Sequence, residues 1–359
     1  MAELFRETMQ EAIDTCVEQE LPFVFYRLPG SNEIHFIGET YPGTIVESES
    51  PGFIFSPFQP DEDANTWFIR KDNHFAGKLE DFAGLHFDIR NISGEDMANT
   101  KITREEFCRQ VEKAVKAIKN GTFDKVILSR VEKVSVDDKN PLAIFMSLCK
   151  RYNSAFVALV VIPGETVWLT ASPELLVSLE GDTVKTVALA GTKPASDNIA
   201  WGEKEKAEQQ MVVDYVHKVL VNNCTDVQMS GPVDAIAGNI AHLKTEFTAT
   251  LSTGMVYLLE DLHPTPAVCG LPKNKALEFI TETELHKRKY YTGYLGPCNM
   301  NGKTEWYVNL RCGELFPDRA NLYIGGGITA DSVPEKEWNE TIMKAQTLLS
   351  VMAPTLKVV

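Results

Sequence analysis

The stretch YIGGGITADSVPEKEWNETIMK, Tyr323–Lys344, organises the rest of the chain because it predicts a short strand, a glycine-rich turn and a capped helix in one unit. Its glycines, Gly325–Gly327, let the backbone approach a ligand closely. Ser332 and Glu335 have the spacing of a capping box, so we expect a helix to start near Val333. The start of a helix therefore lies beside a glycine-rich turn.

The predicted helix has a polar stripe and an apolar stripe. Two carboxylates and an ammonium share the polar stripe: Glu337, Glu340 and Lys344. The apolar stripe is expected to face the core: Trp338, Ile342, Ala345 and Leu349.

A second predicted helix, in EKEKAEQQMVVDYVHKVL, places Glu205 and Glu208 at the same spacing as the first glutamate pair. If the two pairs face each other, their oxygens suit Mg²⁺, which takes oxygen ligands and keeps waters or substrate oxygens in its shell. The alternative is that these glutamates lie on exposed helix faces, as is common in an acidic protein. The pattern alone leaves both interpretations open.

Composition limits the class of protein. The chain has 359 residues, 44% of them hydrophobic, which is enough for a sizeable core in one or two domains. A net charge of −15 argues against nucleic acid or an anionic membrane as the main partner. No apolar run has transmembrane length and the start is an acidic amphipathic helix, so we expect a cytoplasmic location. The 7 scattered cysteines predict reduced, buried thiols rather than disulfides or a zinc site.

The polar segment NISGEDMAN, residues 91–99, is typical of a linker or loop. We therefore expect residues 1–100 to form an N-terminal part of the same domain and residues 101–359 to form its catalytic core. No catalytic motif precedes the linker.

Two residues with acid–base potential follow in the core. Lys125 opens the predicted strand KVILSRVEKVSV, where a buried amine could act as a general base near neutral pH. Glu174 lies between apolar runs in VWLTASPELLVSL, which would raise its carboxyl pKa and favour the proton-donating form. The alternatives are a solvated lysine at a strand end and a glutamate that points to water.

Two further segments could bind a substrate. The backbone amides of Gly191 and Thr192, in the AGT motif after a predicted strand, could hold a carboxylate. His263, beside Pro264, could orient a substrate or could be an ordinary loop histidine.

The segment KYYTGYLGPCNMNGKTEWYVNLRCGEL predicts a hairpin that turns at Asn301-Gly302. On its second strand, Tyr307, Asn309 and Arg311 are expected to share one face. An arginine on an interior face needs an anion, and its guanidinium suits a substrate carboxylate.

Taken together, these motifs resemble the chorismate-utilising enzymes, and within them the isochorismate synthases. They are, in the family's order, KVILSR, SPELL, AGT, EKEKAE, HPTPAVCG, VNLRC, GGGI and EWNET. The resemblance spans Lys101–Met352 and covers little of the chain before it. It implies an α+β fold in which two large, mostly antiparallel sheets pack face to face, with helices outside and the site in a cleft.

The resemblance also implies a cofactor, Mg²⁺, and a substrate, chorismate. The carboxylates it implies for the metal are Glu208 and Glu340, directly or through water, with Glu205 and Glu337 in an outer acidic shell. The positions it implies for the ring carboxylate are Gly191, Thr192 and Lys344. Those it implies for the enolpyruvyl carboxylate are Arg311 and the Gly325 backbone, with His263 and Ala267 also at the substrate.

The chemistry implied by the family is an isomerisation. Lys125 resembles the base that activates water to attack C2 of the ring, and Glu174 resembles the acid that protonates the departing C4 hydroxyl. The product would be isochorismate, for menaquinone or siderophore synthesis.

Three positions discriminate between relatives. Anthranilate synthase lacks a lysine at the position of Lys125, and aminodeoxychorismate synthase usually has a lysine in place of Ala190. Salicylate synthase shares the Lys and Glu pair but also expels pyruvate, and such lyases tend to have threonine where this chain has Ala267. The chain departs from the usual pattern at Gln209, where histidine is common, and at TKPAS, where an arginine often follows the proline.

We therefore expect an isochorismate synthase, with salicylate synthase as the alternative. We expect a monomer without a glutamine amidotransferase subunit. An acidic metal-binding or regulatory module that is not an enzyme is the interpretation from another class.

Overall fold

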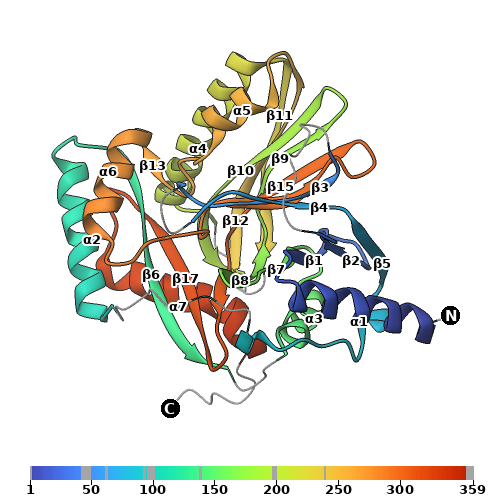
Figure 1. Cartoon of the computed structure of the whole chain (residues 1–359). Helices are drawn as coiled ribbons and strands as arrows, with labels where there is room; N and C mark the ends of the chain where they lie inside the picture. Colours follow the sequence, from blue (N-terminus) through green and yellow to red (C-terminus); the bar gives the residue numbers. More distant parts are fainter. Residues whose placement is uncertain are drawn as a thin grey trace.

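A computed structural model describes residues 2–41, 50–60, 64–91, 94, 102–136, 140–195, 200–237 and 240–352. Two antiparallel sheets organise this part of the chain (Figure 1). The nine-stranded sheet has the order β13 (Gly270–Leu271), β6 (Lys125–Ser135), β17 (Arg319–Ile328), β16 (Cys312–Leu315), β8 (Thr166–Ser172), β7 (Phe156–Ile162), β1 (Phe23–Arg27), β2 (Glu33–Gly38) and β5 (Asn73–Lys78). The eight-stranded sheet has the order β11 (Cys224–Ala237), β12 (Ile240–Leu251), β10 (Thr183–Pro194), β9 (Leu175–Glu180), β15 (Lys303–Val308), β14 (Tyr294–Cys298), β3 (Gly52–Ser56) and β4 (Trp67–Arg70).

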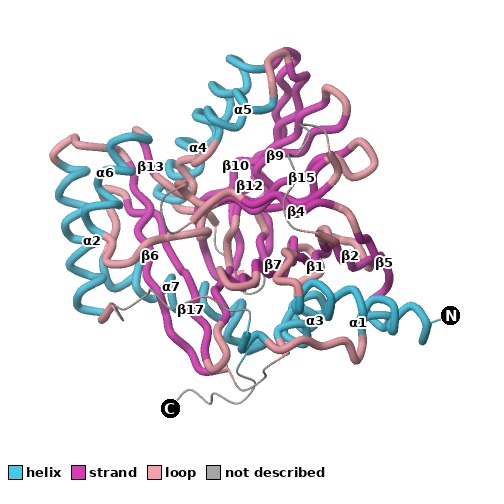
Figure 2. The backbone as a smooth tube through the Cα atoms, viewed as in Figure 1, coloured by secondary structure: helices cyan, strands magenta, loops and turns pink. Residues whose placement is uncertain are grey.

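Helices flank the two sheets (Figure 2). They are α1 (Ala2–Glu18), α2 (Arg104–Lys119), α3 (Pro141–Arg151), α4 (Glu203–Asn223), α5 (Met255–Leu262), α6 (Lys273–Thr283) and α7 (Pro334–Met352), with short 3₁₀ turns η1 (Leu79–Phe82) and η2 (Ile89–Asn91). None of these helices, within the described ranges, is long and apolar enough to cross a membrane.

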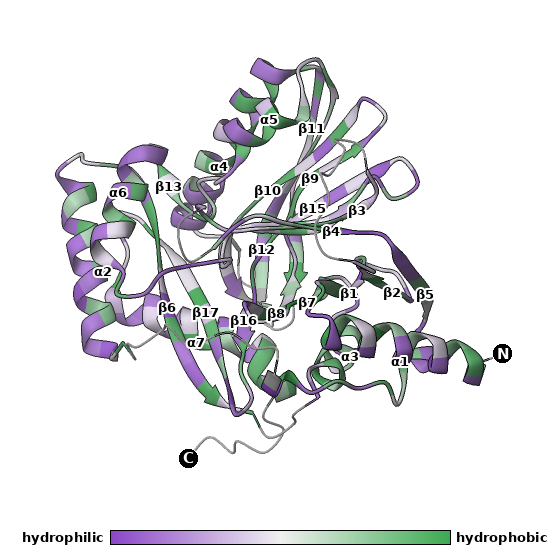
Figure 3. Cartoon of the chain, viewed as in Figure 1, coloured by the Kyte–Doolittle hydropathy of each residue, from purple (hydrophilic) through white to green (hydrophobic). Residues whose placement is uncertain are grey.

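Side chains from both sheets fill the space between them. Phe156 of β7 stacks on Tyr307 of β15, with ring centroids 4.2 Å apart and the rings almost parallel. Hydrophobic colour follows the strands through the middle of the molecule, whereas α1 and α2 carry both kinds of residue (Figure 3). Because each large buried apolar side chain contributes about 1.5–3 kcal/mol, this shared core holds the sheets together. The predicted α+β fold of two face-to-face antiparallel sheets is confirmed.

The first hundred residues contribute strands to both sheets. Strands β1, β2 and β5 extend the nine-stranded sheet, and β3 and β4 extend the eight-stranded sheet. The N-terminal part therefore shares its core with the rest of the chain. Most of the predicted linker, residues 91–99, lies outside the described residues.

The glycine run and the helix after it differ from the prediction in detail. Gly325–Gly327 form no turn but pair with β6 as part of β17. Helix α7 begins at Pro334, close to the expected start. The capping box is wrong: the hydroxyl of Ser332 accepts a hydrogen bond from the N–H of Thr329, and Glu335 forms an ion pair with Arg104. Ile342, expected in the core, is 43% exposed.

Two segments cross from one sheet to the other, and neither crossing was predicted. The run VWLTASPELLVSL divides at Pro173-Glu174 into β8 of one sheet and β9 of the other. The predicted strand through Arg311 likewise ends at Val308, and the chain resumes as β16 in the other sheet. Arg311 therefore lies in a crossing segment, with a positive φ of 50°, and not on a strand face beside Tyr307. The predicted turn at Asn301-Gly302 is confirmed between β14 and β15, with both residues at positive φ.

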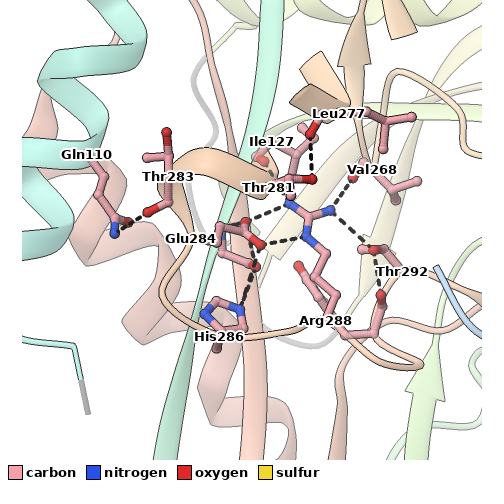
Figure 4. Close-up of polar contacts among 12 residues, drawn as sticks. Gln110, Ile127, Val268, Leu277, Thr281, Thr283, Glu284, His286, Arg288 and Thr292 are labelled. Carbon is pink, nitrogen blue, oxygen red and sulfur yellow. Dashed lines mark hydrogen bonds and ion pairs between the residues drawn. The ribbon is translucent and has the colours of Figure 1, made fainter. Parts of the chain in front are cut away.

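A buried ionic cluster joins three segments of the chain (Figure 4). The guanidinium of Arg288 donates two hydrogen bonds to Glu284, at 2.7 and 2.8 Å. It also donates to the carbonyl oxygens of Val268 and Ile127, each at 2.8 Å. The carboxylate of Glu284 accepts from the N–H and hydroxyl of Ser129. One arginine thus ties β6 to the loops on either side of α6.

Removing Arg288 should destabilise the protein strongly, because Glu284 would keep a buried charge without its partner. We expect R288M to lower the free energy of unfolding by about 3–5 kcal/mol. The matched control is K275M, since Lys275 pairs with Glu278 at the surface, and such pairs contribute about 0–1 kcal/mol. Urea unfolding of both variants measures the difference. If the free energy of unfolding of R288M were as close to that of wild type as that of K275M, the cluster would not contribute to stability.

Candidate active site

A cleft with an interior volume of about 90 Å³ lies where the two sheets, α4 and α7 meet. Its wall includes the end of β10, the two crossing segments, the glycines of β17 and the inner faces of α4 and α7. The predicted site residues that line it are Glu174, Gly191, Thr192, Glu208, Ala267, Arg311, Gly325, Glu340 and Lys344. The structure thus brings together most of the predicted site from segments far apart in the sequence.

Glu174 lies in the first crossing segment and is 4% exposed. Burial raises the pKa of its carboxyl to about 8, although Lys125, Lys344 and Arg311 act in the opposite direction. The expected rise in pKa is therefore confirmed, and the alternative of a glutamate that points to water is wrong. At neutral pH this side chain is a protonated acid in a cleft that also holds cations.

Arg311 lies in the second crossing segment, where it lines the cleft and is partly exposed. Burial lowers the pKa of its guanidinium to about 10, so it remains charged at neutral pH. Its Nη2 lies 3.4 Å from His242 Nε2, and its Nη1 has no hydrogen-bond partner among the described residues. A guanidinium whose buried Nη1 is an unfilled donor is suited to an anionic ligand.

Lys125 lies immediately behind the glycine backbone of the cleft. Its side chain has no exposed surface, so the alternative of a solvated lysine is wrong. Its Nζ lies 2.8 Å from Glu208 Oε1 without hydrogen-bond geometry, and no other described residue accepts from it. A Cβ on Gly327 would lie 2.3 Å from that glutamate oxygen and 3.1 Å from Lys125 Cε. Only glycine therefore leaves room for this ion pair beside the cleft.

Two carboxylates of α7 face the neighbouring glycine. A Cβ on Gly326 would lie 3.6 Å from Glu340 Oε1 and 3.9 Å from Glu337 Oε2. Burial and the nearby Glu340 raise the pKa of Glu337, against the ion pair with Lys204. Burial also opposes the charged form of Glu340, but the ion pair with Lys344, at 2.6 Å, outweighs it and lowers the pKa.

These carboxylates fit a hard divalent cation. Glu208, Glu337 and Glu340 all approach the Gly326-Gly327 backbone, where the missing side chains leave space. Within the described ranges, no set of three or more His, Cys, Asp or Glu side chains is already arranged around a metal position. Mg²⁺ commonly takes one or two carboxylates and completes its shell with water and substrate oxygens, so the donor set suits it.

Two predicted residues do not join this group. The carboxylate of Glu205 turns back to Gly202 at the start of α4, with Oε2 2.5 Å from the position of a Cβ there. His263 is buried against Tyr294, with ring centroids 5.1 Å apart, and does not line the cleft. The expected outer-shell place of Glu205 and the substrate contact of His263 are thus not found.

Sequence reasoning missed two residues of the cleft wall. His242 on β12 lies 2.8 Å from the Gly191 carbonyl through Nδ1, and burial lowers its pKa to about 3, so the ring is neutral. Its other nitrogen therefore faces Arg311 as an acceptor. The hydroxyl of Tyr291 lies 2.6 Å from the position of a Cβ on Gly325. Neither residue has a local motif: the pairing of β12 with β10 brings His242 to the cleft, and Tyr291 lies in the turn before β14.

The geometry suits acid–base chemistry on an anionic ligand. A protonated carboxyl and an arginine with an unfilled donor line one cleft, a buried lysine lies behind its glycine wall, and the neighbouring carboxylates could hold a cation. Although the protein as a whole is acidic, an anion could bind here because these positive charges lie at the cleft.

Comparisons with known proteins agree with this site. A family model described as chorismate binding enzyme matches residues 78–353 of the chain. The chain is 33% identical to isochorismate synthase DhbC from Bacillus subtilis (strain 168) over 269 residues, covering 69% of this chain and 68% of that protein. It is 29% identical to isochorismate synthase MenF from the same organism over 292 residues, covering 76% of this chain and 62% of that protein.

The fold is also similar to a crystal structure of DhbC from Bacillus anthracis. The TM-score is 0.77 at 24% identity, covering 98% of this chain and 99% of that chain. This likeness, which extends over the first hundred residues, concerns the fold. The family match covers more than half of the chain and begins before Lys101, where the sequence resemblance began. The chain therefore belongs to the family of chorismate binding enzymes.

Proposed function

We propose that this chain is an isochorismate synthase that isomerises chorismate with Mg²⁺ as its cofactor. The observation that carries the proposal is the buried, protonated Glu174, which faces a cleft with cations on its walls. Such an acid can protonate a leaving hydroxyl at neutral pH. The likeness to isochorismate synthases of Bacillus subtilis supports the same activity.

In the proposed reaction, the oxygen of a water molecule bonds to C2 of the ring while the C–O bond at C4 breaks and the double bonds shift. Lys125 accepts the proton of the attacking water, and Glu174 gives its proton to the departing hydroxyl, which leaves as water. One water enters and one leaves, so the product is an isomer of the substrate. Gly327 keeps the space between Lys125 and the cleft free of a side chain.

The two carboxylates of chorismate would bind at separate cations. Arg311 would hold the enolpyruvyl carboxylate through its unfilled Nη1, beside the Gly325 backbone. The ring carboxylate would lie near Lys344 and the backbone of Gly191 and Thr192, on the side of Glu208 and Glu340. The carboxylates of Glu208 and Glu340 would hold Mg²⁺. When bound, Mg²⁺ supplies a positive charge that orients the ring carboxylate of the substrate and draws electron density from the ring.

The second candidate is salicylate synthase, which forms isochorismate and then expels pyruvate. It would use the same Lys125 and Glu174. Ala267 favours the isomerase, because it lines the cleft where such lyases tend to have threonine.

We also propose a setting for the enzyme. The product would supply menaquinone or siderophore synthesis, and the protein would act in the cytoplasm as a monomer without an amidotransferase subunit. The cysteines support a reducing compartment, since all seven are buried and free. Water, rather than ammonia, is the nucleophile in the proposed reaction, so no ammonia-producing partner is needed.

A product assay tests the function. Purified protein is incubated with chorismate and Mg²⁺, and the products are separated while pyruvate is measured in the same tube. We expect an isomer of unchanged mass without pyruvate. Salicylate with stoichiometric pyruvate would make the enzyme the lyase, and no conversion would favour a binding module.

Replacing Lys125 separates chemistry from binding. We expect K125A to lose at least about 100-fold in kcat, because a positioned general base typically contributes 10²–10⁴-fold. Mg²⁺-dependent chorismate binding, measured by calorimetry, should remain. K119A, at the exposed end of α2, is the control for the loss of a positive charge. Full turnover in K125A would refute its role as the base.

The pH dependence follows from Glu174. Because the acid must be protonated, kcat/KM should fall as the pH rises through about 8, and well above that pH it should fall about tenfold per pH unit. E174Q should lose most of its activity, and its remaining activity should not show this fall in kcat/KM at high pH. E180Q, at the exposed end of β9, should keep the wild-type profile. A wild-type profile that stays flat to pH 9, below the pKa of about 10 of Arg311, would contradict the assignment.

A further inference from the structure

Lys204, which no motif singled out, joins the two helices that carry the carboxylates. It lies in the first turn of α4, and its Nζ donates a hydrogen bond of 2.9 Å to Glu337 Oε1 on α7. The side chain of Glu337 is 3% exposed, whereas that of Lys204 is 32% exposed. A partly exposed lysine on α4 thus binds a nearly buried carboxylate on α7.

Helix α4 alone does not explain a lysine at this position. The N-terminus of a helix carries a partial positive charge, so a cation in the first turn is unfavourable there. The N-cap residue Gly202 makes no side-chain cap bond that would compensate. What Lys204 gains at this position is its contact with Glu337.

The three lysines paired with these carboxylates do not bind them in the same way. Lys125 and Lys344 contact Oε1 of Glu208 and of Glu340, at 2.8 and 2.6 Å. In both glutamates, Oε1 is also the oxygen that lies nearest the glycine backbone of the cleft. These two ammonium groups therefore cover the oxygens that face the glycines.

Lys204 takes the opposite oxygen. It contacts Oε1 of Glu337, whereas Oε2 is the atom that faces Gly326, 3.9 Å from the position of a Cβ. Glu340 Oε1 approaches the same point to 3.6 Å. The ammonium thus fixes the rear oxygen of Glu337 and leaves the front oxygen directed to the space beside Glu340.

We propose that Lys204 is a positioning residue for the divalent cation: it holds Glu337 turned so that Oε2 faces Gly326 beside Glu340. A partner that orients a metal-binding side chain typically changes metal affinity by 10–100-fold when it is removed. Lys204 thus strengthens cation binding although it is itself a cation. This inference rests on the metal site of the proposed function.

Calorimetric titration of Mg²⁺ into the protein without substrate tests the inference, because it needs no turnover. We expect K204M to bind Mg²⁺ about 10–100-fold more weakly than wild type. K204R, which can still donate to Oε1, should recover most of the affinity. K206M is the matched control, since Lys206 lies in the same helix and pairs with the exposed Glu203. It should bind Mg²⁺ as wild type does.

Two outcomes would overturn the inference in different ways. If K204M binds Mg²⁺ as tightly as wild type or more tightly, Lys204 does not position Glu337 for the cation, and the proposed function stands. If wild type binds no Mg²⁺ with or without chorismate, the metal site of the proposed function fails together with the inference. K204Q, which keeps a polar side chain, replaces K204M if thermal unfolding shows that the latter does not fold.

Discussion

The arrangement of the cleft depends on two crossing segments that satisfy each other's backbone hydrogen bonds between the sheets. The N–H of Val308 donates to the carbonyl of Glu174 at 3.0 Å, and the hydroxyl of Ser172 donates to the carbonyl of Val308 at 2.5 Å. A chain that leaves a sheet inside the protein needs such partners, because an unpaired buried backbone group is costly. The N–H of Ala171 also donates to the carbonyl of Arg311 at 3.1 Å, so Glu174 and Arg311, one on each crossing, are held on the wall of the same cleft.

Burial then determines the charge of each group. Desolvation disfavours the charged form of both side chains, but their intrinsic pKa values differ so much that the outcomes are opposite. Glu174 becomes neutral at pH 7, with a pKa of about 8, whereas Arg311 keeps its charge with a pKa of about 10. One environment therefore supplies both a proton donor and an anion-binding cation. The glycines of β17 also shape the site, because a side chain at Gly327 would displace the ion pair of Lys125 and Glu208.

The sequence predicted the type of fold and most residues of the cleft, because local chemistry marks them: an acid between apolar runs, a lysine at a strand start and glutamates at helical spacing. It did not predict which strands change sheet, so Arg311 was placed on a strand face and Gly325–Gly327 in a turn. Pairing between distant segments decides both, and local periodicity does not record it. His242 was missed for the same reason, and no local pattern records that the carboxylate of Glu205 turns to Gly202.

The account depends most on the protonation state of Glu174. Infrared difference spectra of wild type against E174Q, with glutamate labelled by ¹³C, isolate the carboxyl band of this one side chain during a pH titration. The account predicts a protonated carboxyl that persists through neutral pH and ionises with a midpoint near pH 8. Ionisation near the ordinary glutamate pKa of 4.5 would contradict it, because the cleft would then lack its acid at neutral pH.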